Sequence, residues 1–258
     1  MDGKILVLDF SGLRGEKRFA GSVYMDFRNL AGTDGYCSEE AASILRREIR
    51  QEGYGGIHFL DSGNYHYLTK FFLEQIREPF QLAVFDHHTD MQPPALLPLL
   101  SCGSWLLDTL KENRFLKKVY LAGPPKERIR ECAFLPEAGS GRLICVSEEE
   151  LEHLDSREFP GWQQQLPLYI SIDTDVLGRE DARTNWDQGN LKLEKLCRIL
   201  QAAGRGVKIL GADICGGIPP QKLREEWEET EKINSRTDSR LLMCIQKMKK
   251  QEDTRNGI

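Results

Sequence analysis

Acidic and histidine residues follow two apolar runs of this sequence at alternate positions. One run ends in Asp86, His88 and Asp90, and the other ends in Asp173 and Asp175. Carboxylates and imidazoles bind divalent cations, and carboxylates buried side by side are costly unless a cation compensates their charge. These residues therefore predict a metal site. The alternative, that Asp-rich strand ends are ordinary loop starts or helix N-caps, is weaker when two such ends occur together.

The elements that position these residues are strands of a parallel sheet. The apolar runs 82–85 and 168–172 are typical of strands that are buried on both faces. In open α/β sheets, ligands bind just beyond the carboxyl ends of the strands. A third short strand, 57–60, precedes His66, which we therefore expect at the same edge of the sheet as Asp86. His87 lies between two candidate ligands, and strand alternation points it away from the metal.

The rest of the chain alternates between strands and helices, which predicts a single three-layer αβα domain over residues 1–258 with a central, mostly parallel sheet. Pro- and Gly-rich stretches at 123–125 and 136–141 are expected to be connectors. The predicted strands are 4–10, 22–28, 57–60, 82–85, 119–122, 143–146, 168–172 and 207–214. The predicted helices are 38–51, 65–76, 105–113, 191–203 and a C-terminal helical segment at about 221–251. A further helix is predicted to start at Ser147.

Composition limits the partners and the compartment. The 258 residues are 40% hydrophobic and 29% charged, with a formal net charge of −5. This charge gives no electrostatic reason to expect binding to nucleic acid or to an anionic membrane, so we expect a small-molecule substrate. No apolar run approaches the ~20 residues that span a bilayer, and the N-terminus reads as a strand and not as a signal peptide. We expect a cytoplasmic protein, with a homo-oligomer suggested only by fold-level analogy.

Seven cysteines are present without any C-x-x-C pair, which argues against a disulfide framework or a zinc knuckle. Cys145, Cys197 and Cys244 lie in apolar patterns and are expected in the core. Cys102 and Cys215 are predicted near the metal site. Each is a candidate nucleophile or redox sensor, although a packing role is favoured because nothing in the sequence indicates a lowered thiol pKa.

Three motifs follow one another along the chain: His66 after Gly63, Asp-x-His-x-Asp at 86–90 and Ser-x-Asp-x-Asp at 171–175. In this order they resemble the motifs of the arginase family, which includes arginase, agmatinase and related ureohydrolases. The resemblance implies two Mn²⁺ ions. It implies that His66, Asp86, Asp90 and Asp173 hold one ion and that Asp86, His88, Asp173 and Asp175 hold the other. Two ions about 3.5–4 Å apart can turn a bridging water into a hydroxide nucleophile near neutral pH.

The sequence departs from the family pattern around the substrate. The family places a substrate-gripping Glu after its last strand, whereas residues 211–217 contain Asp213 and no Glu. Cys102 stands where the family has a His in a His-Gly segment. The candidate catalytic residues are therefore Asp90, Asp213 and Cys102. The candidate substrate-binding residues are Tyr65 and, from a long polar loop, Asn185, Trp186 and Asp187.

Three functions are consistent with these observations. The first is a binuclear manganese hydrolase of a non-peptide C–N bond in a guanidino or amidino molecule. The second is a deacetylase-like amide hydrolase, because the guanidinium-gripping Glu is missing. The third is a catalytically inactive metal-binding homologue of arginase.

Overall fold

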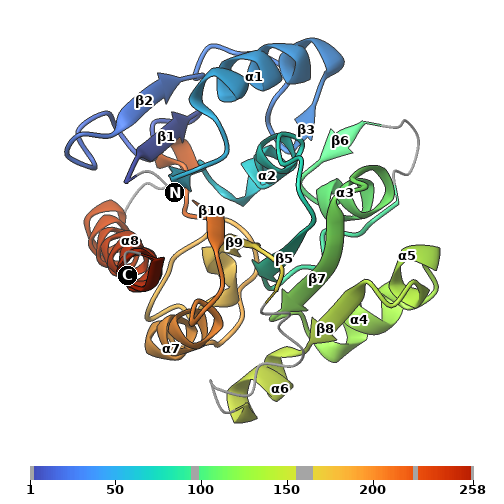
Figure 1. The fold of residues 1–258 in the computed structure, drawn as a ribbon. Coiled ribbons are helices and arrows are strands. Elements are labelled where there is room, and N and C mark those ends of the chain that lie inside the picture. The colour runs from blue at the N-terminus through green and yellow to red at the C-terminus, as the bar shows by residue number, and fades with distance from the viewer. Residues whose placement is uncertain (1–2, 94–98, 155–164, 223–225, 257–258) are drawn as a thin grey trace.

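The computed structural model describes residues 3–93, 99–154, 165–222 and 226–256, and in these residues a central sheet is flanked by helices on both faces (Figure 1). The strands of the sheet, in spatial order, are β2 (Val23–Asp26), β1 (Ile5–Asp9), β4 (Ile57–Phe59), β10 (Ile209–Cys215), β9 (Leu168–Asp173), β5 (Phe80–Phe85), β7 (Leu116–Ala122) and β8 (Leu143–Val146). Every pairing within this sheet is parallel, so the predicted three-layer α/β fold is confirmed.

Two hydrophobic cores cover the two faces of the sheet. Alternate residues of one strand enter different cores: Leu6 and Leu8 join one, and Val7 joins the other. This alternation follows from the two-residue period of a strand. The first core packs against α1 (Glu39–Glu52), α2 (Leu68–Leu73) and α3 (Trp105–Glu112), and the second packs against α7 (Leu193–Ala203) and α8 (Trp227–Asn256).

Helix starts follow the expected capping chemistry. The Ser38 side chain accepts a hydrogen bond from the backbone N–H of Ala41 at the start of α1. Ser147 forms a capping box with Glu150 at the start of α6 (Glu148–His153). Helix α8 extends beyond the predicted end at residue 251, while residues 223–225 of the predicted segment lie outside the described residues.

One expectation was wrong. Residues 136–141, predicted as a connector, contain the short helix α5 (Pro136–Gly139). Pro136 occupies a first-turn position, where the fixed φ of proline favours helix, but a single turn is too short to show apolar periodicity. The remaining elements are the helix α4 (Lys126–Cys132), the antiparallel pair β3 (Tyr36–Cys37) and β6 (Leu100–Ser101), and the 3₁₀ turns η1 (Gly63–Tyr65), η2 (Thr174–Val176) and η3 (Pro220–Lys222).

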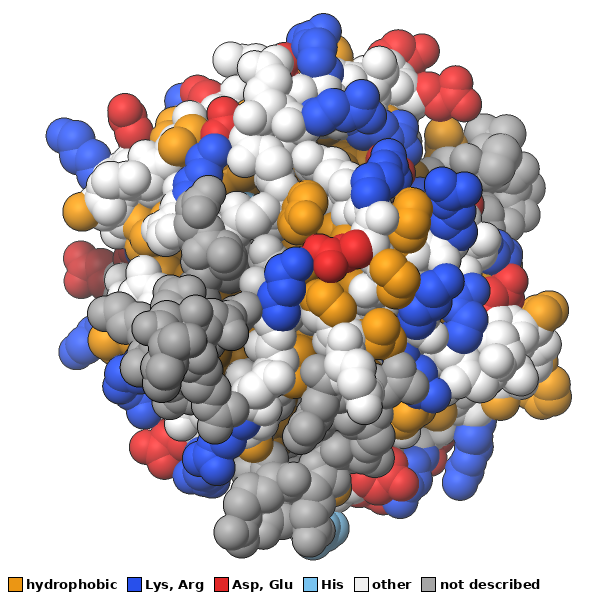
Figure 2. Space-filling model, viewed as in Figure 1, with side chains coloured by type: hydrophobic (Ala, Val, Ile, Leu, Met, Phe, Trp, Pro, Cys, Tyr) orange, Lys and Arg blue, Asp and Glu red, His pale blue; other side chains and the backbone are white. Residues whose placement is uncertain are grey.

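Charges of both signs are spread over the surface. Lys and Arg side chains and a smaller number of Asp and Glu side chains are scattered over the face shown in Figure 2. Within the described residues, none of the helices combines the length and the apolar character that crossing a lipid bilayer requires.

Candidate metal centre

The candidate site lies at the carboxyl ends of three adjacent strands, β10, β9 and β5. Asp86 directly follows β5, Asp173 ends β9, and Asp175 lies in the η2 turn that follows it. His66 reaches the same edge from the segment between η1 and α2, although β4, the strand before it, is separated from β5 by β10 and β9. The structure thus brings the three predicted motifs together.

His66 is the centre of one group of candidate ligands. Its Nδ1 lies 3.0 Å from Asp86 Oδ2, 3.0 Å from Asp90 Oδ2 and 3.9 Å from Asp173 Oδ2. None of these contacts has hydrogen-bond geometry, so Nδ1 is buried among carboxylates without a hydrogen-bond partner. The ligand atoms of His66, Asp86 and Asp90 lie within 4.8 Å of one another.

A buried relay fixes the orientation of the His66 ring. Ser171 Oγ donates a 2.6 Å hydrogen bond to Asp213 Oδ1 and lies 2.9 Å from His66 Nε2. Because the single hydroxyl proton is used on Asp213, Ser171 accepts from the Nε2–H of His66. Nδ1 is therefore the ring nitrogen that faces the carboxylates, and metal-binding histidines are oriented in the same way by a hydrogen bond at their other nitrogen.

His88 is the centre of the second group. Its Nδ1 lies 2.8 Å from Asp175 Oδ2 and 3.4 Å from Asp86 Oδ1, and its Nε2 lies 2.9 Å from Asp187 Oδ1. The ligand atoms of Asp86, His88 and Asp175 again lie within 4.8 Å of one another. Asp86 therefore belongs to both groups. Asp173 falls with His66 and Cys215 in a third group, so its bridging between two ions stays a prediction.

The electrostatics of the site fit divalent cations. Asp86, Asp90, Asp173 and Asp175 are all at least nine-tenths buried. Burial and the charge of Asp86 raise the pKa of Asp90 to about 6, and burial and Asp173 raise the pKa of Asp175 well above its usual range. The protein alone therefore leaves this negative charge undercompensated. Its oxygen- and nitrogen-rich donor set suits Mn²⁺, which would offset the charge.

The backbone is adjusted around the candidate ligands. Asp90 has a φ of 50°, the left-handed region, and its Oδ2 accepts a 2.6 Å hydrogen bond from Trp105 Nε1. A Cβ on Gly63 would lie 2.8 Å from Asp173 Oδ2 and 2.9 Å from Trp186 Cδ1. Glycine at position 63 thus lets the Trp186 ring approach the candidate ligands closely.

A pocket of about 610 Å³ opens onto these groups, a volume typical of small-molecule sites. Trp186, Asp187 and Cys102 line it, as do Asp86, His88, Asp90, Asp173 and Asp175. Asn64 Oδ1 accepts hydrogen bonds from Trp186 Nε1 and from Asn185 Nδ2, which holds the polar loop over the site.

Among the described residues that line the pocket, His66 is absent, and so are three of the predicted catalytic and substrate-binding residues. Tyr65 belongs to a hydrophobic core, where its ring stacks on Phe10 at 4.3 Å. Asn185 supports the loop through Asn64, and Asp213 is fully buried behind Ser171. Burial raises the pKa of Asp213 to about 6. This placement favours an orienting role for Asp213 over contact with substrate.

Sequence reasoning gave no role to Ser171, Trp105, Asn64 or Arg128. Ser171 had a usable signal, since it lies two residues before Asp173 and a strand returns to the same face at that spacing. Arg128 lines the pocket, pairs with Asp187 and donates a 3.1 Å hydrogen bond to the backbone oxygen of His87. Trp105 and Asn64 carry no such signal, because packing between distant segments brings the start of α3 and the η1 turn to the site.

Comparison with known proteins agrees with the geometry. No family model matches the chain. An uncharacterized protein of Thermotoga maritima is 30% identical over 234 residues, covering 89% of this chain and 86% of that protein.

Two solved structures share the fold. One is agmatine ureohydrolase of Thermoplasma volcanium, with a TM-score of 0.67, 13% identity and coverage of 96% of this chain and 91% of that one. The other is Trypanosoma cruzi formiminoglutamase with Mn²⁺, with a TM-score of 0.63, 12% identity and coverage of 94% and 93%. The chain therefore belongs to one family with the Thermotoga maritima protein and has the arginase and ureohydrolase fold.

Proposed function

We propose that this protein is a metal-dependent hydrolase that cleaves a non-peptide C–N bond in a small guanidino or amidino molecule. The observation that carries the proposal is the convergence of two ligand groups that share Asp86 beside one small-molecule pocket. His66, Asp86, Asp90 and Asp173 would hold one Mn²⁺ ion, and Asp86, His88, Asp173 and Asp175 the other. When bound, such a pair of ions activates water near neutral pH and polarises the bond under attack.

The protein's own groups would position and deprotonate the attacking water. Asp90 lines the pocket, where its carboxylate would accept a proton from the attacking water. The hydrogen bond from Trp105 fixes the Asp90 carboxylate. The relay through Ser171 keeps His66 Nδ1 turned toward the metal.

The charge of the pocket favours a cationic substrate. Six lining residues are carboxylates, Asp86, Asp90, Glu131, Asp173, Asp175 and Asp187, whereas Arg128 is the single Arg or Lys among the described lining residues. Two divalent ions would offset four of these charges. Arg128 pairs with Asp187, so Glu131 remains to hold a guanidinium or amidinium group, and the face of the Trp186 ring adds a cation–π surface.

Structural likeness supports the reaction class. Among the matched structures are proclavaminate amidino hydrolase from Streptomyces clavuligerus and agmatine ureohydrolase, whose names describe C–N bond hydrolysis. We extend that chemistry to this chain because the folds match over most of its length and its own candidate ligands converge at one sheet edge.

An amide hydrolase is the second candidate, and Gly216 favours it. A Cβ on Gly216 would lie 2.1 Å from Thr174 Oγ1, so this position after β10 cannot carry the substrate-gripping Glu of the ureohydrolases. An acylated amine would not need that carboxylate. A metal-binding homologue without turnover is the third candidate.

Product analysis distinguishes these candidates. Protein reconstituted with Mn²⁺ should release urea or ammonia from at least one member of a guanidine and amidine panel. Asp86→Asn should abolish release and reduce the bound manganese, whereas Asp26→Asn, the same change on the exposed strand β2, should alter neither. Acetate release from acylated amines would support the amide hydrolase instead. Two bound ions without any turnover would contradict both enzymes.

A further inference from the structure

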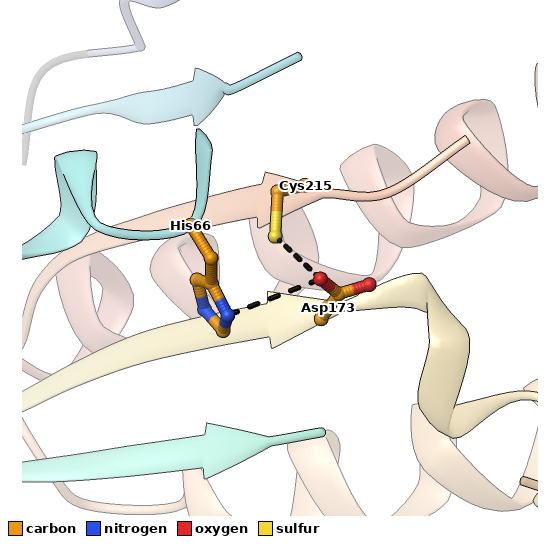
Figure 3. A group of neighbouring side chains, drawn as sticks. All are labelled: His66, Asp173 and Cys215. Carbon is orange, nitrogen blue, oxygen red and sulfur yellow. Dashed lines mark hydrogen bonds and ion pairs between the residues drawn. The ribbon is translucent and has the colours of Figure 1, made fainter. Parts of the chain in front are cut away.

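Cys215, the last residue of β10, lies beside the candidate ligands and is not among the described residues that line the pocket. Its side chain is fully buried, and its thiol donates a 3.1 Å hydrogen bond to Asp173 Oδ2. Figure 3 shows Cys215, Asp173 and His66 pointing toward one another from three different segments. One ligand atom of each lies within 4.8 Å of the others. A side chain so placed cannot contact substrate, yet it faces two predicted metal ligands.

We propose that Cys215 supplies a thiolate ligand to the ion held by His66 and Asp173, and that this sulfur shifts the metal preference of that position from manganese toward zinc. The inference rests on the metal centre of the proposed function. The thiolate of Cys215 would add a soft sulfur donor to a set of metal ligands that is otherwise made of oxygen and nitrogen atoms. Thiolates favour Zn²⁺, whereas carboxylate sites favour Mn²⁺.

The spacing of the three side chains is compatible with one shared ion. Zinc binds Cys sulfur at ~2.3 Å and His nitrogen or Asp oxygen at ~2.0–2.2 Å. Because Asp86 and Asp90 are candidate ligands of the same ion, Cys215 would be a fifth ligand, and adjacent ligand atoms of a five-coordinate ion lie ~2.9–3.8 Å apart. Cys215 Sγ lies 3.1 Å from Asp173 Oδ2, His66 Nδ1 lies 3.9 Å from Asp173 Oδ2, and one ligand atom of each residue lies within 4.8 Å of the others.

A second observation points to a ligand at this position. His66 Nδ1 is buried without a hydrogen-bond partner and faces the same carboxylate that Cys215 contacts. An unpaired imidazole nitrogen is costly in a buried site unless it is protonated or bound to a metal. The relay through Ser171 holds Nε2, so Nδ1 is the ring nitrogen directed at the group.

The backbone after Cys215 is built for close contact with Asp173. Gly216 has a φ of +107°, and a Cβ there would lie 2.9 Å from Asp173 Oδ1. Glycine therefore lets the end of β10 approach the carboxylate closely. Cys215 is carried to the metal ligands by this approach, which a larger residue at position 216 would prevent.

Cobalt spectroscopy tests the proposal directly. Metal-free wild type, Cys215→Ser and Cys102→Ser are each titrated with Co²⁺. We expect a near-ultraviolet thiolate-to-cobalt charge-transfer band in wild type and in Cys102→Ser, a matched control because Cys102 lines the pocket outside the group. Cys215→Ser should lose this band and keep the visible cobalt bands. Its preference for Zn²⁺ over Mn²⁺ in competition should fall by about tenfold or more.

A measurement on the unchanged protein covers the case in which Cys215→Ser does not fold. X-ray absorption of zinc-loaded wild type should show sulfur in the coordination shell at ~2.3 Å. Bound cobalt without a charge-transfer band, a band that survives in Cys215→Ser, or a zinc shell without sulfur would overturn the thiolate while leaving the metal centre in place. Protein that binds neither cobalt nor zinc would overturn both.

Discussion

The Ser171 relay yields a sharp prediction, because one atom links two buried groups. Ser171→Ala removes the acceptor for His66 Nε2–H, 2.9 Å away, and the donor to Asp213 Oδ1, 2.6 Å away. Removing a partner that orients a metal ligand costs about 10- to 100-fold in metal affinity. That factor corresponds to ~1.4–2.7 kcal/mol of binding free energy. Each buried group left unpaired also costs ~1–3 kcal/mol of folding stability.

Chelator competition with Mn²⁺ measures the affinity, and urea unfolding of metal-free protein measures the stability. Ser62→Ala is a matched control, since this serine is also fully buried but its hydroxyl makes no hydrogen bond. We expect Ser62→Ala to bind Mn²⁺ like wild type. Equal affinity in wild type, Ser62→Ala and Ser171→Ala would refute the reasoning that the relay holds His66 as a ligand.

Three other predictions concern a glycine substitution, the pH dependence of stability and the removal of metal. Gly216→Ala should cost more stability than Gly21→Ala by urea unfolding, because both have positive φ but only Gly216 has no room for a Cβ. The pKa of Asp213 is about 6 in the folded protein, which is above its value in the unfolded chain. The contribution of Asp213 to the free energy of unfolding should therefore fall as the pH rises. Between pH 4 and 7, the free energy of unfolding of metal-free wild type should fall by ~2–3 kcal/mol relative to that of Asp213→Asn. The same pH dependence of unfolding in both proteins would argue against this role of Asp213. Chelation should lower the melting temperature of wild type but leave that of Asp86→Asn nearly unchanged, as calorimetry would show.

The convergence of the candidate ligand motifs could be predicted because strand chemistry is local. Apolar runs ending in Asp86 and Asp173 identify buried strands, and the alternate spacing of positions 86, 88 and 90 predicts that their side chains share one face. The sheet edge then follows from the rule that parallel strands present their carboxyl ends together. Both steps use neighbours within a few residues.

The remaining features depend on contacts between distant segments. The sheet order places β10 between β4 and β9, and no local pattern specifies that insertion. Tyr65 directly precedes His66, yet a short 3₁₀ turn directs its ring into the core. Asn185 and Asn64 meet across two loops. Such placements are decided by packing, which sequence periodicity does not encode.

The position of β10 has a consequence for synthesis of the chain. This strand is the last of the sheet in sequence order but pairs with both β4 and β9 near its middle. Until it emerges from the ribosome, the hydrogen-bonding edges of β4 and β9 have no partner between them, and such edges invite intermolecular pairing. A nascent polypeptide that stalls before residue 209 should therefore depend on chaperones, and the sheet edge with the candidate ligands can close only after translation has passed β10.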